Sequence, residues 1–343
     1  MLKLKSELRK GVLYLLKKMP WSYQDRVHYF HRFKRLPNIH QPKLFNEKIL
    51  YRKFVTGDYV RYGNLSDKVL VRDYIAKTIG EEYLIPLLHE TDNPLTLLGL
   101  SSLKNTVIKP NHGSGMVEIL LEEPDCIQKQ LLIKRCDEWL KCDFSHQSRE
   151  IHYRYIKPRI LVEEYVGEGK LAAVDYKFHM FNKKDGNFEY VLQIIYNRNG
   201  DAPLSMNFYV NSLEQCFYKI RDTGLDISSD RETLEKALAL SQKLASDFDY
   251  VRVDWYICEG QIFFGELTFT PGAGMVTGLD MGLDKMMGDM WLQERKAAKL
   301  KQNSGDVTPL PVAFKRCNAN RSINKPFPLR ENGLIVFRAG DNQ

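Results

Sequence analysis

The chain has 343 residues, 43% of them hydrophobic and 27% charged, which predicts a globular protein of two or three lobes. Fifty lysines and arginines against 43 acids leave a net charge of +7. This suits phosphate-bearing ligands or an anionic membrane, whereas no basic run with interleaved aromatics predicts a nucleic-acid partner. Six cysteines without CxxC spacing, no long apolar run and no signal-peptide pattern favour a cytoplasmic protein.

Residues 1–60 predict a basic, partly aromatic N-terminal helical arm. Apolar residues recur at helical spacing from Leu4 to Met19, and basic residues occupy many of the positions between them. Such a helix can lie on an anionic membrane, or it can pack on the protein's own core with a solvated basic face, and the pattern does not separate the two. Residues 21–60 predict short helices that wrap a neighbouring lobe.

Residues 61–105 predict an N-terminal α/β segment. Ser66 is a plausible N-cap for an amphipathic helix over residues 66–79 that closes at Gly80, and a strand is expected over residues 83–88.

The rest of the chain predicts two α+β lobes and a tail. In the first lobe, residues 106–170, the expected elements are strands over 106–109 and 159–166, a helix over 127–142 and a loop at 145–149. In the second lobe, residues 171–297, they are strands over 172–220, a helix over 231–248 and a hairpin over 251–268. Residues 298–343 are polar and predict a peripheral tail.

The hairpin is the most informative segment. Both limbs are β-branched and aromatic, and Glu259-Gly260 supplies the turn between them. Each limb carries one acid among apolar neighbours, Asp254 in the first and Glu266 in the second. Because a lone buried carboxylate is costly, two that face each other beside Arg252 indicate a divalent cation and an anionic substrate between them.

A second candidate site is a glycine-containing turn. Lys109 ends an apolar strand and precedes Pro-Asn-His-Gly-Ser-Gly, in which the amides of Gly113, Ser114 and Gly115 can point at phosphate oxygens. The spacing is neither GxxxxGK[ST] nor GxGxxG, so neither a Walker site nor a dinucleotide fold is supported. Taken alone, such a turn is more often an ordinary hairpin loop.

Two further charged residues accompany predicted strands. The Glu163 carboxylate can accept a hydrogen bond from the exocyclic amine of a purine, although for this residue alone we favour a strand end that enters solvent. Lys177 lies in an alternating run, where it can point at phosphates or at water.

Taken together and in this order, Lys109, Glu163, Asp254 and Glu266 resemble the ATP-grasp superfamily. They resemble in particular its TupA-like branch, which is involved in teichuronopeptide and surface-polysaccharide biosynthesis. The resemblance covers roughly residues 38–274 and is carried by PKLFNEK at 42–48, SDKVLVR at 66–72, GEEYLIP at 80–86, VIKPNHGSG at 107–115, RVD at 252–254 and GELTFTPGAG at 265–274. It implies an α+β ATP-grasp fold, with two lobes that clasp ATP and an added N-terminal arm.

The resemblance also implies roles for individual residues. Binding of ATP would fall to Lys109 with the turn at 113–115, to Arg72 at the phosphates, and to Glu163 with the backbone of Tyr165 and Val166 at the adenine. Lys177 is a further candidate for the phosphates because of its place in the strand pattern. Asp254 and Glu266 would bind Mg²⁺, and Arg252 and Lys109 would be catalytic. Thr268 stands where many relatives carry an asparagine as a further metal ligand, and its hydroxyl is a weaker ligand for magnesium.

The implied activity is that of an ATP-dependent carboxylate–amine ligase, which forms an amide through an acyl phosphate. Its partners would be an amino acid or other amine and a uronic acid of a surface polysaccharide or its precursor. Two alternatives remain: an ATP-grasp kinase acting on a sugar or small molecule, and a non-catalytic, membrane-associated scaffold of glycan assembly. The protein is expected in the cytoplasm, in peripheral contact with an anionic membrane or a glycan assembly complex. Residues 271–274 are expected either to contact the reacting carboxylate or to form a structural turn.

Overall fold

The computed structural model describes residues 14–168, 171–172, 174–183, 185–196, 205–221, 227, 230–276, 278–293 and 334–336. Within these ranges two antiparallel sheets are flanked by helices, so the predicted α+β class is confirmed. The predicted helix at the very N-terminus is described only from residue 14, and most of the tail at 298–343 lies outside the described residues.

The first sheet has five strands. Across the sheet they run β1 (Leu87–Thr91), β4 (Ile160–Glu164), β2 (Thr106–Pro110), β3 (Glu118–Leu120) and β13 (Leu334–Val336). Helix α6 (Cys126–Leu140), which starts with a capping box of Asp125 and Gln128, packs its Leu132 and Cys136 on Ile108 and Val162 of the sheet. A short ribbon of β5 (Gly167–Glu168) and β6 (Leu171–Ala172) leaves the end of β4.

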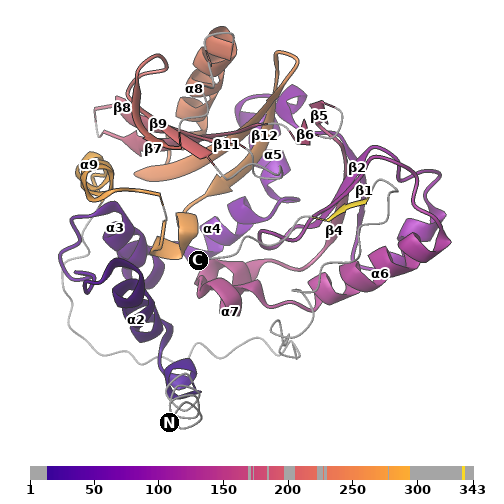
Figure 1. Ribbon diagram of the computed structural model, residues 1–343, viewed down its shortest axis with the longest axis horizontal. Helices are drawn as coiled ribbons and strands as arrows, with labels where there is room; N and C mark the ends of the chain where they lie inside the picture. The colour runs from indigo at the N-terminus through magenta and orange to yellow at the C-terminus, as the bar shows by residue number, and fades with distance from the viewer. Residues whose placement is uncertain are drawn as a thin grey trace.

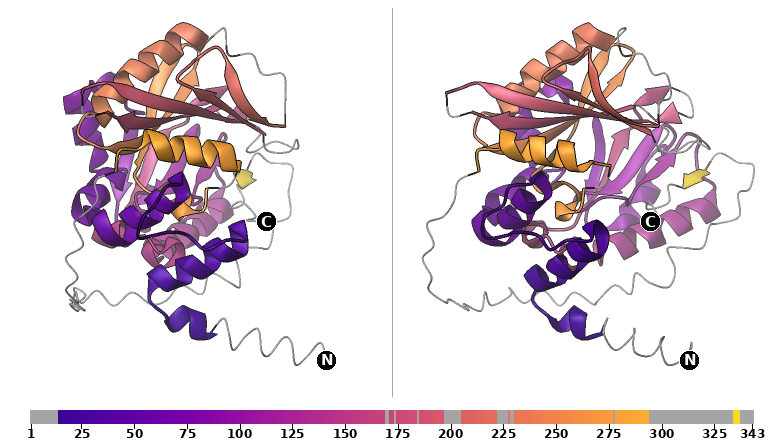
Figure 2. Two further views of the ribbon diagram at one scale, coloured as in Figure 1. Left: turned by 90° about the vertical axis from the view of Figure 1, so that its left-hand side faces the viewer. Right: turned by 60° about the vertical axis from the view of Figure 1, so that its left-hand side comes forward.

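The second sheet has six strands. In spatial order they are β10 (Cys216–Ile220), β9 (Ser205–Val210), β8 (Phe188–Tyr196), β7 (Val174–Asn182), β11 (Tyr250–Cys258) and β12 (Gln261–Thr268). Helix α8 (Arg231–Ala245) covers one face with Leu234, Leu240 and Leu244 (Figure 1). Helices α3 (Phe45–Tyr51) and α9 (Met281–Met290) lie under the opposite face (Figure 2).

Short helices connect these layers. The first of them are α2 (Trp21–Phe33), η1 (Arg52–Thr56), α4 (Tyr59–Ser66), α5 (Val71–Thr78), η2 (Glu81–Tyr83) and η3 (Pro94–Gly99), followed later by α7 (Phe144–Ser148), η4 (Ile151–Tyr155) and η6 (Pro271–Gly274). Buried Arg52 joins η1 to the second sheet. Its guanidinium donates to the carbonyls of Tyr250, at the start of β11, and Phe269, just after β12, and it pairs with Asp249. None of the described helices is long and apolar enough to cross a membrane.

Three predicted elements differ from the structure. The helix expected from Ser66 starts only at Val71, because the Asp67 carboxylate accepts the amides of Val69 and Leu70 and separates α4 from α5. The strand expected over residues 83–88 starts at Leu87, after the 3₁₀ turn η2 and after Pro86, which has no amide to donate. The loop expected at 145–149 is the helix α7.

Candidate active site

The two hairpin acids lie directly opposite each other. The register of β11 and β12 pairs Asp254 with Glu266 and Arg252 with Thr268. Arg252 donates to Asp254 through Nε and Nη2, at 2.6 and 2.7 Å, and to Glu266 through Nη2 at 2.6 Å. Both carboxylates therefore face the same side of the sheet, as predicted, and one guanidinium joins them.

A β-bulge at Gly265 makes this arrangement possible. Asp254 pairs with Glu266, but the next residue, Trp255, pairs with Phe264, so Gly265 is the extra residue. A Cβ at Gly265 would lie 3.1 Å from the Asp254 carbonyl oxygen. Without the bulge, Phe264 and Glu266 would share a face; with it, Phe264 enters the core under α8 and Glu266 points the other way.

Lys177 lies beside Asp254 on the neighbouring strand β7. The register pairs the two residues, and the Lys177 ammonium forms ion pairs with Asp254 and, at 3.5 Å, with Asp175. Burial alone would raise the pKa of Asp254, but Arg252 and Lys177 outweigh burial and hold that pKa below its ordinary value. Lys177 is only 5% exposed, so it points at carboxylates and not at water; its role at phosphates remains a prediction.

A neutral histidine lies beside Arg252 on the neighbouring strand β7. His179 pairs with Arg252 in the register, and its ring nitrogens lie 2.8 Å from the Tyr250 hydroxyl and 3.3 Å from Gln193 Oε1. Burial lowers the pKa of His179 to about 3, so the ring adds no charge beside the guanidinium.

In the first sheet, Glu163 is a buried member of an ion-pair cluster. Its side chain lies 2.6 Å from Lys109 Nζ on the adjacent strand and 3.5 Å from Arg72 Nη1. Glu163 is 4% exposed, whereas the next residue, Glu164, is exposed. The interpretation that Glu163 enters solvent is therefore wrong. Arg72 also donates to the Ile85 carbonyl oxygen at 2.9 Å, so its interactions link α5 to the start of β1.

The glycine turn is a loop between the antiparallel strands β2 and β3, and it combines a fixed base with an exposed tip. At the base, the Asn111 amide nitrogen donates to Asp67 at 2.9 Å, and His112 Nε2 lies 3.2 Å from the Cys142 carbonyl oxygen. Burial lowers the pKa of His112 to about 4, which marks it as a neutral anchor. Gly113 has a φ of 123°, and a Cβ there would lie 2.7 Å from Met116 Cε. At the tip, residues 114–115 are exposed.

Lys68 is a candidate site residue that was not predicted from the sequence. This residue lies in the turn that Asp67 makes between α4 and α5, and its Nζ donates to the Gly113 carbonyl oxygen at 2.6 Å. Burial lowers the pKa of Lys68 against the opposing influence of Glu266, and the charges of Lys109 and Glu163 also act on it. Lys68 therefore contacts the glycine turn and lies close enough to Glu266 for their charges to interact. The signal that could have located it is Asp67, whose side chain interrupts the helix.

The other predicted residues lie at the edges of this arrangement. Thr268 donates to Glu266 Oε1 at 2.9 Å and so orients the carboxylate. Tyr165 follows β4, and its amide donates to the Asn105 carbonyl oxygen at 2.9 Å, so Tyr165 and Val166 come directly after the strand that carries Glu163. The roles of Thr268, Tyr165 and Val166 as ligand contacts remain predictions.

The segment that follows β12 is a tight left-handed turn. Gly272, Ala273 and Gly274 all have positive φ, at 55°, 53° and 82°. Buried Lys53 donates to the Ala273 carbonyl oxygen at 3.1 Å, and the Thr270 hydroxyl donates to buried Glu150. Two charged residues from other elements, Lys53 and Glu150, thus hold this segment in place. Its contact with a substrate remains a prediction.

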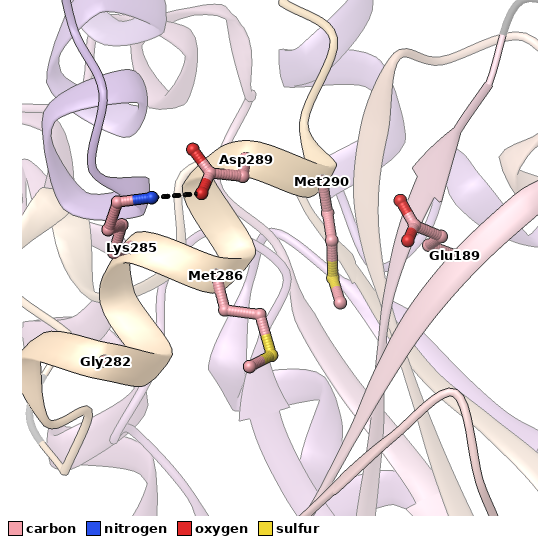
Figure 3. Close-up of a pocket in the computed structure, with 6 residues that line it drawn as sticks. All are labelled: Glu189, Gly282, Lys285, Met286, Asp289 and Met290. Carbon is pink, nitrogen blue, oxygen red and sulfur yellow. Dashed lines mark hydrogen bonds and ion pairs between the residues drawn. The ribbon is translucent and has the colours of Figure 1, made fainter.

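Among the described residues, no group of three or more His, Cys, Asp or Glu side chains could hold a metal ion. A cavity of about 410 Å³ lies elsewhere, between α9 and the start of β8 (Figure 3). Its lining residues are Glu189, Gly282, Lys285, Met286, Asp289 and Met290. None of these belongs to the arrangement above, so the cavity is not part of the candidate active site.

The family model described as TupA-like ATPgrasp matches residues 47–292. The chain belongs to the TupA-like ATP-grasp family. The matched range includes Lys68, the glycine turn, Glu163 and the hairpin acids, and the predicted ATP-grasp fold is confirmed. No curated protein matches the chain at a significant level.

Solved structures with similarity to this TupA-like ATP-grasp chain include two D-alanine–D-alanine ligases and a biotin carboxylase. The ligase from Helicobacter pylori is 19% identical, with 67% of this chain and 61% of that chain covered and a TM-score of 0.42. The Bacillus anthracis ligase complexed with ATP is 16% identical, with 67% and 64% covered and a TM-score of 0.35. The Campylobacter jejuni biotin carboxylase complex is 10% identical, with 73% and 49% covered and a TM-score of 0.39. The chain therefore spans less than two thirds of the length of each.

Proposed function

We propose that this TupA-like ATP-grasp protein is an ATP-dependent carboxylate–amine ligase that forms an amide through an acyl phosphate. The observation that carries the proposal is the pair of facing carboxylates, Asp254 and Glu266, bridged by Arg252. Lys68 lies close enough to Glu266 for their charges to interact, and it contacts the glycine turn directly. Carboxylates and cations concentrated in this way suit the polyanionic tail of ATP.

The cations have separate tasks in the proposed reaction. An oxygen of the substrate carboxylate attacks the γ-phosphorus of ATP, the bond to the β-phosphate oxygen breaks, and ADP leaves. Lys109 and Lys68 flank the glycine turn and would neutralise the phosphates of the nucleotide. Arg252 lies on the side of the hairpin acids and would stabilise the charge of the acyl phosphate. The substrate amine then attacks the carbonyl carbon, inorganic phosphate leaves with the electrons of the broken C–O bond, and the amine nitrogen gives up one proton, which passes to the departing phosphate or to solvent.

The hairpin acids fit a magnesium ion. Mg²⁺ is usually bound by one or two protein carboxylates together with waters and substrate phosphates, so a two-carboxylate set is sufficient. The hydrogen bonds that Glu266 accepts from Arg252 and Thr268 both go to Oε1, while Asp254 uses both of its oxygens in its pairs with Arg252 and Lys177. Glu266 would thus be the principal ligand and Asp254 the second. When bound, the ion would offset charge on the phosphate oxygens.

Water must be kept from the acyl phosphate, because it would hydrolyse this intermediate. The exposed tip of the glycine turn, Ser114 and Gly115, is suited to cover the phosphates, and its base is held in place by buried Asn111 and His112. The turn at Pro271–Gly274 follows the strand of Glu266 directly and is our candidate for contacts to the reacting carboxylate.

For the substrates, we propose an amino acid or similar amine and a uronic acid of a surface glycan or its precursor, joined in the cytoplasm. The branch of the family supports this choice of substrates. A screen of amino acids against uronic-acid acceptors, with phosphate release as the signal and mass spectrometry of the product, tests it. We expect an amide, with one ADP formed per bond. A phosphorylated acceptor would instead indicate a kinase, and nucleotide binding without turnover by any pair would indicate a scaffold.

A further inference from the structure

Helix α2 turns an apolar stripe toward solvent. On one side of the helix, Asp25 and Tyr29 are completely buried against the protein. On the other, Tyr23, Val27 and Phe30 are 51%, 46% and 52% exposed. These three residues are spaced four and three positions apart, so they form a single row along the helix. A row of large apolar side chains left in water indicates a binding surface.

Three further apolar side chains are exposed just before α2, on the N-terminal side of Pro20. Tyr14, Leu15 and Met19 are 60%, 64% and 42% exposed. We call Tyr14, Leu15, Met19, Tyr23, Val27 and Phe30 the arm face. In Figures 1 and 2, α2 lies at the edge of the molecule farthest from α8, where neither sheet lies beneath it. Helix α2 therefore lies outside the two sheets, at a rim of the molecule.

The exposed charges in this stretch of the chain are of one sign. Between residues 14 and 36 the only acid is Asp25, which is buried and paired with Lys53 and Arg149. Lys17, Lys18 and Lys34 are exposed in the same stretch. Apolar aromatic side chains bordered by cations, with no exposed acid among them, match the interface of an anionic bilayer.

Aromatic rings and cations also lie together along this edge. Lys18 Nζ lies 4.4 Å from the centre of the Tyr14 ring, and the Arg26 guanidinium lies 5.6 Å from that of Tyr23. Tyrosine is favoured at the boundary between lipid headgroups and acyl chains, where lysine and arginine reach the phosphates with their charged ends.

We propose that the arm face binds the surface of an anionic phospholipid membrane. The opposite face of α2 is fixed to the protein by the buried pairs of Asp25 with Lys53 and Arg149, so the helix docks as a rigid part of the molecule. Lys53 also contacts the Ala273 carbonyl oxygen, which follows β12, and this joins the docking helix to the segment next to the hairpin acids. Membrane binding by α2 does not depend on the ligase activity.

Co-sedimentation of the full chain with vesicles tests the proposal. The vesicles consist of phosphatidylcholine alone or of phosphatidylcholine mixed with phosphatidylglycerol. The arm-face variant carries Tyr23→Ser, Val27→Ser and Phe30→Ser, and a charge variant carries Lys17→Gln and Lys18→Gln. The matched control carries Leu95→Ser and Leu98→Ser, because these leucines are 60% and 55% exposed on η3, away from α2.

We expect the wild-type chain to bind the phosphatidylglycerol vesicles and to be released by added salt. The arm-face variant should bind at least about tenfold more weakly, and the charge variant about fivefold more weakly for each lysine removed. The control should bind as the wild type does. Circular dichroism and nucleotide binding establish that each variant is folded.

Two results would overturn the proposal. One is equal vesicle binding by the wild type and a folded arm-face variant. The other is no binding of the wild type to anionic vesicles. If the wild type then self-associates and the arm-face variant is monomeric in sedimentation velocity, the arm face belongs to an interface with a second copy of the chain.

Discussion

Arg252 and Glu266 are joined by a hydrogen bond of 2.6 Å across β11 and β12, and the same guanidinium holds Asp254. A planar fork of donors is needed to reach both acids at once, and a lysine would supply only a point charge. Arg252→Lys should therefore fold but lower kcat for ADP formation by on the order of 10²-fold. A coupled ADP assay with the substrate pair measures this. A kcat within about threefold of the wild type would show that the bridge is not needed.

Lys68 should matter more to ATP binding than Arg72. Lys68 donates to the glycine turn and interacts electrostatically with Glu266. Arg72 instead forms an ion pair with Glu163 and donates to the Ile85 carbonyl oxygen. We expect Lys68→Met to weaken ATP binding by about 10- to 100-fold, equivalent to about 1.4 to 2.8 kcal/mol, and Arg72→Met to weaken it less. Isothermal titration calorimetry with ATP and Mg²⁺ measures the Kd of both variants. A larger loss of ATP affinity in Arg72→Met than in Lys68→Met would make Arg72 the main phosphate contact.

The buried pair of Lys53 with Asp25 should contribute strongly to stability. Removing one partner of a buried ion pair typically costs about 3–5 kcal/mol, and because Arg149 still pairs with Asp25 after the change, we expect the lower end of this range, about 3 kcal/mol. Lys53→Met should lower the free energy of unfolding by this amount in urea titrations. The control is Lys285→Met, whose side chain is 66% exposed and pairs with Asp289, and which should cost less than about 1 kcal/mol. Equal losses in the free energy of unfolding for the two substitutions would show that the buried ion pair contributes no more to stability than the exposed one.

Stability should fall in mild acid because two buried histidines stay neutral in the folded protein. Burial lowers the pKa of both His152 and His179 from 6.5 to about 3. Below about pH 6.5 the unfolded chain takes up protons that the folded chain does not, so the free energy of unfolding decreases as the pH falls toward 3. Between pH 8 and pH 5 each histidine should account for about 2 kcal/mol of this loss.

His152→Gln isolates the contribution of one histidine. Urea titrations of the wild type and the variant at both pH values should show a smaller loss for the variant by about 2 kcal/mol, whatever its stability at pH 8. An identical loss in the two proteins would mean that His152 is protonated in the folded state.

Local patterns were sufficient to predict the hairpin. The alternation of apolar residues and the turn at Glu259-Gly260 depend only on near neighbours in the chain, and so does the position of the glycine turn after Lys109. The bulge at Gly265 was not predicted, although it decides which face Glu266 occupies. A strand pattern alone does not show where one extra residue is inserted.

Contacts between distant segments could not be predicted in the same way. Glu163 is buried because Lys109 and Arg72 come from other elements, and the sequence shows only an acid at the end of an apolar run. Lys68 was counted as a residue inside a helix, because the turn formed by Asp67 depends partly on a hydrogen bond from Asn111, 44 positions away. Asp25 pairs with Arg149 across 124 positions, and no spacing rule predicts that pair.

The central claim is that Asp254 and Glu266 hold the metal and nucleotide for an acyl-phosphate ligase. The most direct test compares ADP formation by the wild type, Asp254→Asn and Glu266→Gln in the presence of Mg²⁺ and the amine and carboxylate pair found in the screen, with thermal unfolding as the control for folding. We predict that both folded variants lose at least about 10²-fold in kcat. Full ATP consumption and amide yield by either folded variant would contradict the assignment.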